Sequence, residues 1–206
     1  MSGRPIWRRC AARRSCVDHN KGLESRVWSL EFELQTPDSR HETQDSDCAM
    51  SDDLKRQILE YMQAHNTMTL ATSADDVPWA ATVFYASDDL RLYFFSAPDS
   101  RHCQNLAANP RVAVTIQEDY HDWRQIKGIQ MEGAVTLVDG VLEKAKAMAF
   151  YARKYPGVIK LFTDPGSGIF YKAFLKVKFY CVVPQRVFYI DNEQGFGKRQ
   201  ELPVTE

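Results

Sequence analysis

The sequence predicts an α+β protein built on a small antiparallel β-barrel of six or seven strands with flanking helices. Short segments rich in β-branched and aromatic residues alternate with turn residues over much of the chain, which is typical of an antiparallel sheet. Three other segments carry apolar residues at helical spacing. A barrel also removes the exposed strand edges that such a chain would otherwise present. The 206 residues are 44% hydrophobic, which fits one globular domain and a tail.

The first helix is expected near residues 52–64. Asp52 and Asp53 suit the positive end of a helix dipole, and Ser51 is a favourable N-cap residue. The apolar positions at helical spacing are Leu54, Ile58, Tyr61 and Met62. Strands are then expected at 67–72, 79–85 and 90–96, joined by aspartate-containing turns into a meander.

The second half of the chain predicts more strands and two helices. A short helix opens after Pro98 and ends near Ala108, and a strand follows at 111–116. A long strand is expected at 124–138, where Gly128 and Gly133 permit a bulge. A helix at 140–155, closing strands near 173–182 and 186–190 and a loop at 192–198 complete the domain. The apolar face predicted for the helix at 140–155 consists of Val141, Leu142, Ala145, Met148, Ala149 and Ala152.

Composition excludes several classes of function. The chain has 26 Lys and Arg residues against 27 Asp and Glu residues, so its net charge of −1 does not suit a general nucleic-acid-binding protein. No apolar run reaches the ~18 residues of a transmembrane helix. Phosphate-loop, dinucleotide-fold, zinc-protease and serine-hydrolase motifs are absent from the sequence. The five cysteines lack a disulfide framework, which favours a reducing, cytoplasmic compartment.

Residues 1–49 differ from the rest, and we predict a disordered extension before a domain at 50–206. The stretch 36–47 is polar and cannot bury apolar surface. Three other interpretations of the extension compete: a twin-arginine signal at Arg13-Arg14, an organelle transit peptide and a zinc site. The signal lacks its apolar stretch, and the zinc site lacks a Cys-x-x-Cys pair. If the extension comes from an upstream start codon, Met50 is the true start.

One segment has the chemistry of an anion site. Residues 96–102 leave a strand and enter a helix, whose first turn offers unpaired N–H groups and a partial positive charge. Ser100 adds a hydroxyl, Arg101 a planar cation and His102 a further donor, so together they could hold a phosphate. The alternative is a simple helix cap, with Arg101 on a solvated face.

Lys127 is a second candidate. Alternation on the strand at 124–138 places Gln125, Lys127, Ile129 and Met131 on one face. A lysine on an otherwise apolar face is costly unless it is paired with an anion. The alternative is an edge strand from which Lys127 reaches solvent.

The order of these motifs resembles the flavin-binding split barrels related to pyridoxamine 5′-phosphate oxidase. The segments that carry the resemblance are 78–85, 92–96, Ser100-Arg101-His102 and Asn109-Pro110-Arg111-Val112. The segments 126–133, 151–156 and 191–198, with the ending Gly195-Phe196-Gly197-Lys198, are similar to the YhbP family of uncharacterised bacterial proteins. The resemblance covers about 52–190 and leaves residues 1–49 unmatched.

The resemblance implies a homodimer that binds FMN between its subunits. It places Thr82, Val83, Phe84 and Tyr85 along the flavin ring, and Phe95 and Ser96 beside the ring or the ribityl chain. It places Ser100, Arg101 and His102 at the phosphate, and Lys127 on a strand that supplies a further polar contact. No catalytic side chain and no metal ligand is implied.

The resemblance also leaves the reaction open. Ala80 and Tyr85 stand where the oxidase carries a basic pair, and His102 replaces another basic residue, so oxidation of pyridoxamine phosphate itself is not expected. The sequence therefore predicts an FMN-dependent oxidoreductase of unknown substrate. The alternatives are a non-catalytic module that binds flavin or haem, and a deazaflavin enzyme.

Overall fold

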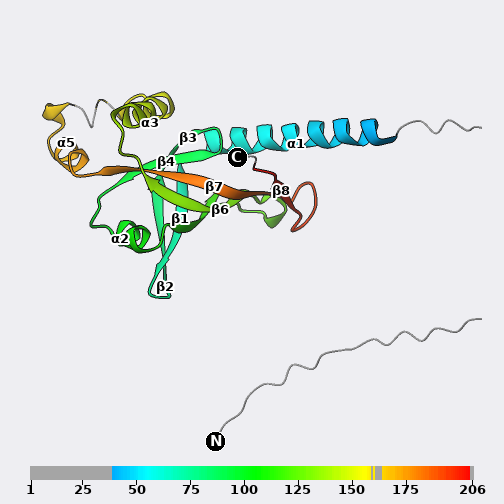
Figure 1. Ribbon diagram of the computed structural model, residues 1–206, viewed down its shortest axis with the longest axis horizontal. Helices are drawn as coiled ribbons and strands as arrows, with labels where there is room; N and C mark the ends of the chain where they lie inside the picture. Colours follow the sequence, from blue (N-terminus) through cyan, green and yellow to red (C-terminus); the bar gives the residue numbers. More distant parts are fainter. Residues whose placement is uncertain (1–38, 159, 161–163, 205–206) are drawn as a thin grey trace, which may run out of the picture. The chain divides into compact units, whose positions relative to one another are not determined.

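The computed structural model describes residues 39–158, 160 and 164–204, and its main feature is one curled antiparallel sheet (Figure 1). In chain order the strands are β1 (Thr67–Ala74), β2 (Val77–Phe84), β3 (Ala86–Asp88), β4 (Arg91–Ser96), β5 (Arg111–Gln117), β6 (Lys127–Leu137), β7 (Lys178–Asp191) and β8 (Arg199–Leu202). They lie in the order β2-β1-β5-β6-β7-β4-β3, and β8 pairs with β7. The α+β class and the antiparallel barrel-like sheet are confirmed.

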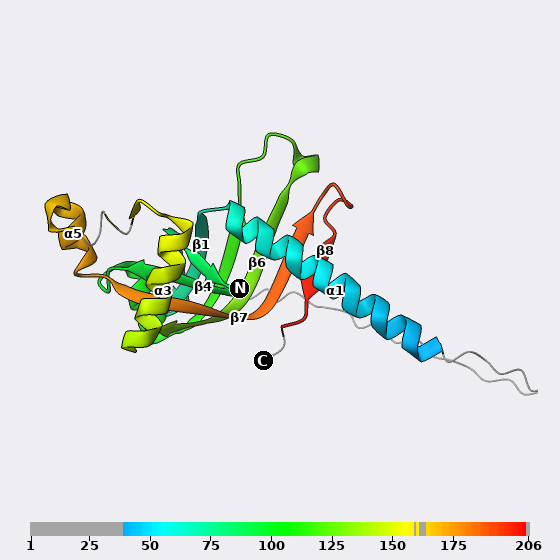
Figure 2. The ribbon, with the colours of Figure 1, turned by 90° about the horizontal axis from the view of Figure 1, so that it is seen from above.

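The helices pack around this sheet. They are α1 (Ser39–Ala64), α2 (Arg101–Ala108), α3 (Val141–Lys154) and α5 (Ile169–Phe174), with short 3-10 turns η1 (Trp123–Gln125) and η2 (Pro165–Ser167). Figures 1 and 2 show α3 and α5 at one end of the sheet, and Figure 1 shows α2 on the other side of the sheet from α3. Within the described part of the chain, no helix combines the length and the apolar character needed to cross a lipid bilayer.

Helix α1 buries the face that the sequence predicts but begins earlier. Leu54, Ile58, Tyr61 and Met62 are all in the core. The prediction that the helix begins after Ser51 is wrong, because the helical backbone already begins at Ser39. No glycine or proline interrupts residues 39–64, so helix can extend from the packed turns into the polar segment. Residues 1–38 of the predicted extension lie outside the described residues.

The first strands form the predicted meander. Asp75 and Asp76 both have positive φ angles of 50° and 59°, and they form the two-residue turn between β1 and β2. Asp89, with a φ of 50°, turns the chain between β3 and β4. The short strand β3 was not predicted, because Ser87 and Asp88 are typical turn residues and were assigned to the turn before the next strand.

The predicted bulge lies at Gly133. There the β6–β7 register shifts, so that Glu132 faces Arg186 while Gly133 faces Pro184. A Cβ atom added at Gly133 would lie 2.4 Å from the carbonyl oxygen of Val183, which explains the glycine. The bulge also lets Pro184 stay inside a continuous strand.

The C-terminal region differs from its prediction. Residues 178–191 form one strand rather than two, because the bulge absorbs Pro184. Residues 173–177 were predicted as strand, but α5 ends at Phe174 and β7 begins only at Lys178. The short strand β8 follows the predicted loop and pairs with β7. The strand predicted at 124–138 begins at Lys127, because residues 123–125 form η1.

The sheet does not close on itself, and α3 joins its two ends. Strand β2 lies at one end of the strand order, and β4 and β3 lie at the other. The Tyr151 hydroxyl lies 2.8 Å from the carbonyl oxygen of Phe84 on β2 and 3.0 Å from that of Tyr93 on β4. The Tyr155 hydroxyl lies 2.8 Å from the carbonyl oxygen of Tyr85, just after β2. These contacts hold the split together from within the protein.

Lys154, on the same side of α3, caps the end of α1. Its Nζ atom donates to the carbonyl oxygens of Met62 at 3.0 Å and His65 at 2.6 Å. It also lies 3.7 Å from the centre of the Tyr85 ring. Burial lowers the pKa of Lys154 to about 8. At pH 7 it remains mainly a cation, which suits the negative end of the α1 dipole.

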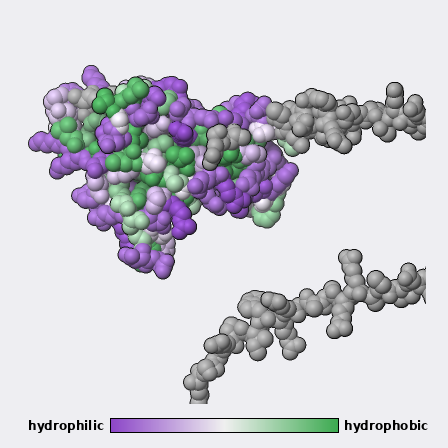
Figure 3. Space-filling model, viewed as in Figure 1, coloured by the Kyte–Doolittle hydropathy of each residue, from purple (hydrophilic) through white to green (hydrophobic). Residues whose placement is uncertain are grey.

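The predicted apolar face of α3 is mostly exposed, so that prediction is wrong. Val141 and Leu142 are 89% and 68% exposed, and the buried residues of the helix are Ala147 and Tyr151. The hydrogen bonds of Tyr151, Lys154 and Tyr155 orient the helix, and they override its apolar stripe. Figure 3 shows hydrophobic surface (green) over α3.

We expect Tyr151→Phe to lower the free energy of unfolding by about 1–3 kcal/mol, because two carbonyl groups at the split lose their hydroxyl partner. Urea denaturation of both proteins measures the difference. Tyr171→Phe, at a half-buried position of α5, is the matched control, because its hydroxyl has no hydrogen-bond partner among the described residues, and it should change stability by less than ~0.5 kcal/mol. Equal stability of Tyr151→Phe and the wild type would contradict the role of this hydroxyl at the split.

Candidate functional site

Three polar side chains converge where β4 leads into α2. Ser96 ends β4, and Ser100 and His102 lie at the start of α2. The Nε2 atom of His102 lies 2.7 Å from the Ser96 hydroxyl oxygen and 3.2 Å from that of Ser100. The two hydroxyl oxygens are 3.3 Å apart. The structure therefore brings together three of the residues that the sequence singled out.

The N-terminus of α2 lies directly beside this cluster. Ser100 occupies the N-cap position, but its side chain makes no capping hydrogen bond. Its hydroxyl faces Ser96 and His102 instead. The first backbone N–H groups of the helix have no partner inside it and carry its partial positive charge. An anion placed here would meet hydroxyl, imidazole and backbone donors together.

Cys103, an isolated cysteine with no motif around it in the sequence, belongs to the same cluster. It is buried next to His102 in α2. Burial acts to raise the pKa of the Cys103 thiol, but hydrogen bonds with His102, Ser100, Tyr180 and Ser96 outweigh it and lower the pKa to about 7. The position of Cys103 between the N-terminus of α2 and these hydrogen-bonding groups accounts for its lowered pKa.

Arg101 points away from the cluster toward β2. Its guanidinium lies 4.3 Å from the centre of the Trp79 ring, in a cation–π contact. Arg101 is exposed, and Trp79 is 39% exposed. Residue type alone did not reveal Trp79 as its partner, because the contact joins two elements that are distant in sequence.

Strand β2 presents a mixture of exposed and structural side chains. Thr82 is exposed and Phe84 is 59% exposed, with Phe84 packed edge-to-face against Tyr155. Val83 faces inward and packs against the core. Tyr85, just beyond the strand, is fully buried and donates its hydroxyl hydrogen to the carbonyl oxygen of Met62 at 2.7 Å.

Phe95 also has a packing role. Its ring lies 4.7 Å from the ring of Tyr151 and 5.7 Å from that of Phe179, centre to centre. Tyr85 and Phe95 therefore hold the backbone near the predicted site, while Thr82 and Phe84 present their side chains to the surface.

Lys127 lies at the other end of β7. Ser96 pairs with Lys178 at the start of β7, whereas Lys127 pairs with Asp191 at its end, thirteen residues later (191 − 178). That is ~40 Å along an extended strand. The structure of one chain therefore does not bring Lys127 to the corner formed by Ser96, Ser100 and His102.

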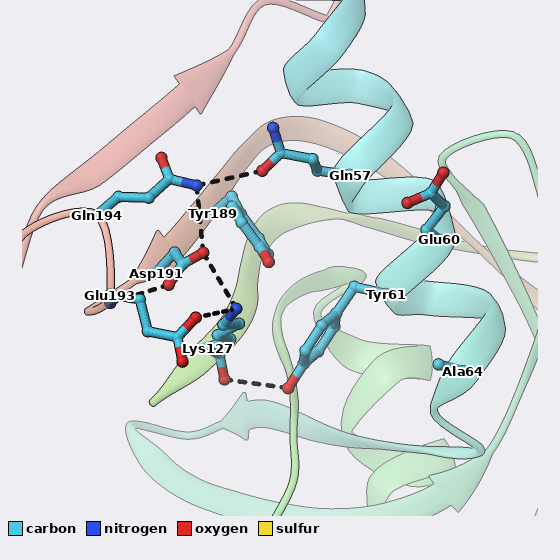
Figure 4. A pocket seen from close by; sticks show the side chains of 9 residues that line it. All are labelled: Gln57, Glu60, Tyr61, Ala64, Lys127, Tyr189, Asp191, Glu193 and Gln194. Carbon is cyan, nitrogen blue, oxygen red and sulfur yellow. Dashed lines mark hydrogen bonds and ion pairs between the residues drawn. The ribbon is translucent and has the colours of Figure 1, made fainter. Parts of the chain in front are cut away.

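The partners of Lys127 are two carboxylates of the same chain. Its Nζ atom lies 2.7 Å from Glu193 and 3.5 Å from Asp191. The hydrogen bond with Glu193 raises the pKa of Lys127, while burial opposes the shift. The sequence pattern predicts an anionic partner for Lys127, and the carboxylates of Asp191 and Glu193 in the same chain are that partner. These residues line a pocket of about 620 Å³ between α1 and the ends of β6 and β7 (Figure 4).

Comparison with known proteins identifies relatives over most of the chain. The family model for pyridoxamine 5′-phosphate oxidase matches residues 54–186. A UPF0306 protein from Photorhabdus laumondii is 30% identical over 144 residues, which cover 69% of this chain and 90% of that protein. A UPF0306 protein from Yersinia pestis is 28% identical over 144 residues, covering 69% and 88% respectively.

Solved structures share the fold at lower identity. A conserved hypothetical protein from Mycobacterium tuberculosis has a TM-score of 0.56 at 21% identity, covering 68% of this chain and 85% of its own. A putative pyridoxamine 5′-phosphate oxidase from Listeria innocua has a TM-score of 0.51 at 18% identity. The match covers 66% of this chain and 98% of that protein. A haem-binding protein from Mycobacterium smegmatis has a TM-score of 0.53 at 19% identity. The match covers 69% of this chain and 56% of that protein. The split-barrel fold inferred from the sequence motifs is thereby confirmed.

The pKa of Cys103 offers a direct check of the cluster. We expect its ¹³Cβ resonance to titrate near pH 7, whereas burial raises the pKa of Cys181 above its usual value. His102→Gln should move the Cys103 titration to higher pH, because a hydrogen bond that favours the thiolate is lost. NMR titration of both cysteines measures this. If Cys103 titrates together with Cys181, the described hydrogen bonds do not form in solution.

Proposed function

Because the chain belongs to the pyridoxamine 5′-phosphate oxidase family, we propose that it is an FMN-dependent oxidoreductase that works as a homodimer. The observation that carries the proposal is the cluster of Ser96, Ser100 and His102 at the N-terminus of α2. The proposal leaves the substrate open.

The cluster fits a phosphate group. A phosphate monoester presents several strong acceptor oxygens, and this corner offers two hydroxyls, an imidazole and the free N–H groups of α2. The Ser100 hydroxyl is available because it does not cap the helix. Arg101 would have to leave Trp79, which costs about 0.5–1 kcal/mol for an exposed cation–π contact. A charged hydrogen bond to phosphate contributes about 1.5–3 kcal/mol, so the exchange is favourable.

The surface of β2 fits the remainder of the cofactor. Thr82 and Phe84 offer an exposed surface on one face of this edge strand, and Trp79, which alternation places on the other face, meets Arg101 at the start of α2. Phe84 can pack against a planar ring, while the backbone groups of Thr82 to Phe84 can contact its polar edge. Tyr151 and Tyr155 fix that backbone from behind, so the strand is already positioned before a ligand arrives.

Bound FMN supplies the capacity to accept and donate electrons, which the side chains of this site lack. The chain then has three tasks: holding the phosphate at α2, orienting the ring along β2, and keeping the ring partly covered. The proposed site needs no side-chain acid or base. The substrate or electron donor would bind against the exposed face of the ring.

A second copy of the chain would cover the outer face of β2. Ala71 pairs directly with Ala80 on β2 and with Ala113 on β5, and all three side chains are exposed on one face of the sheet. Small side chains on three adjacent strands allow another sheet or loop to approach closely. This face continues to Thr82 and Phe84, so a dimer formed here would place the proposed ring site at its interface.

The cysteines bear on the compartment in which the protein works. Cys103 and Cys181 are buried free thiols, which supports a reducing compartment such as the cytoplasm.

Haem is the competing ligand, because the fold is shared with a haem-binding protein. In this chain the His102 Nε2 atom is directed at Ser96 and Ser100, an arrangement that favours a phosphate over an iron atom.

Titration with FMN tests the proposed site. We expect the wild type to bind FMN and Arg101→Ala to bind it roughly tenfold to a hundredfold more weakly, since a charged hydrogen bond is lost. Arg124→Ala removes an exposed arginine that pairs with Asp122 and should leave the affinity unchanged. Flavin fluorescence quenching measures all three. Binding of haem or deazaflavin in preference to FMN, or an unchanged affinity in Arg101→Ala, would contradict the proposal.

A further inference from the structure

We propose that the pocket between α1 and the ends of β6 and β7 binds a small organic cation carrying a primary ammonium group. The site is separate from the proposed flavin site, and the inference does not depend on it. The side chains that define the pocket in Figure 4 are Gln57, Glu60, Tyr61, Lys127, Tyr189, Asp191, Glu193 and Gln194. Its volume of about 620 Å³ is sufficient for a small molecule.

The charges in the pocket leave a negative excess. Lys127 is shared between Asp191 and Glu193, so two carboxylates are matched by one cation. A third carboxylate, Glu60, lies at the rim and pairs with Arg56 on α1. An added cation would therefore complete the charge balance, whereas an added anion would compete with the existing carboxylates for Lys127.

Tyr189 indicates that the pocket is built for a ligand. This residue is only 5% exposed, yet its hydroxyl has no hydrogen-bond partner among the described residues. No described side-chain polar atom is both sealed from solvent and unpartnered, so this hydroxyl keeps some contact with solvent, and its residue lines the pocket. Figure 4 shows it directed into the space between the labelled side chains. A phenol oxygen placed there can accept a hydrogen bond from an ammonium group.

The neighbouring groups complete a matching set. The Tyr61 hydroxyl donates to the carbonyl oxygen of Lys127 at 3.0 Å, and its ring lies 6.0 Å from that of Tyr189, centre to centre. Glu193 and Asp191 line the same pocket as Tyr189 and offer carboxylate oxygens there (Figure 4). An ammonium group has three donors and needs acceptors of this kind. The aromatic rings can cover the carbon chain that carries it.

The loop that contains Gly195-Phe196-Gly197-Lys198 is fixed by contacts that also position residues lining this pocket. Asn192 donates to the carbonyl oxygen of Trp123 at 2.8 Å and accepts from the Gly197 N–H at 3.1 Å. Gly197 has a φ of +68°, and Phe196 packs edge-to-face on Trp123. These contacts fix the loop, so that Gln194 reaches Gln57 on α1 and Glu193 reaches Lys127. The Gly195–Lys198 segment would thus shape a binding pocket, although the proposed flavin site does not use it.

Isothermal titration calorimetry of the full chain with putrescine tests the inference, with 1,4-butanediol as the uncharged analogue. We expect saturable binding of putrescine at one molecule per chain and none of the diol. Glu193→Gln should weaken putrescine binding roughly tenfold, and Tyr189→Phe roughly fivefold. Glu201→Gln alters a carboxylate on β8 that pairs with Arg186 on β7. It is the matched control and should bind putrescine like the wild type.

Several results would overturn the inference. They are the absence of saturable putrescine binding, equal binding of the diol, and equal weakening by Glu201→Gln and Glu193→Gln. Tyr189→Phe keeps the buried ring and removes a hydroxyl that has no hydrogen-bond partner in the described part of the chain, so its urea midpoint should match the wild type. FMN affinity, measured on the same variants, should not change. Loss of FMN binding in the wild type would count against the flavin site alone.

Discussion

The hydroxyl groups of Tyr151 and Tyr155 hold together the two ends of a sheet that does not close on itself. They lie between β2 at one end of the strand order and β4 at the other, and they bond carbonyl groups at both ends. A closed barrel would use a continuous ladder of backbone hydrogen bonds for this purpose. Here a helix supplies the bonds, so the outer side of β2 remains open for other contacts.

The position of the proposed flavin site follows from this arrangement. The split fixes where β2 lies relative to β4, and β4 leads through Ser96 into α2. A shift of α3 would move β2, and the distance between the exposed surface at Phe84 and the anion-binding corner at Ser100 would change. Lys154 extends the same support to α1, because it caps the carbonyl groups of Met62 and His65. One face of α3 thus organises three separate elements.

The long strand β7 separates two regions of opposite chemistry. Its first residues pair with β4 beside the α2 N-terminus, where hydroxyl and backbone donors suit an anion. Its last residue is Asp191, which lies with Glu193 in a pocket that carries a negative excess. A net charge of −1 for the whole chain conceals this local separation. The two proposed sites would therefore bind ligands of opposite charge without competing.

Local signals in the sequence predicted several parts of the structure correctly. The spacing of Leu54, Ile58 and Met62 identified the buried face of α1, and Gly133 identified the bulge. The segment from Ser96 to His102 identified the polar cluster, because its residues are close in sequence and turn together into a helix. In each case the determining interactions lie within one element or between adjacent ones.

Long-range contacts decided the features that the sequence did not predict. The apolar stripe of α3 suggested one orientation, but hydrogen bonds from Tyr151 and Lys154 to distant carbonyls impose another. The carboxylate partners of Lys127 depend on the register between β6 and β7, which periodicity does not reveal. Strand β8 exists because β7 continues past Pro184 and offers it an edge.

Sedimentation velocity of the FMN-reconstituted protein tests most directly the claim that the cofactor lies between two chains. The sedimentation boundary is recorded both at the protein absorbance and at the visible absorbance of flavin. The account predicts that the flavin sediments with a dimer, at one flavin per chain. Flavin that sediments with a monomer, or a protein boundary that carries no flavin at saturating FMN, would contradict it.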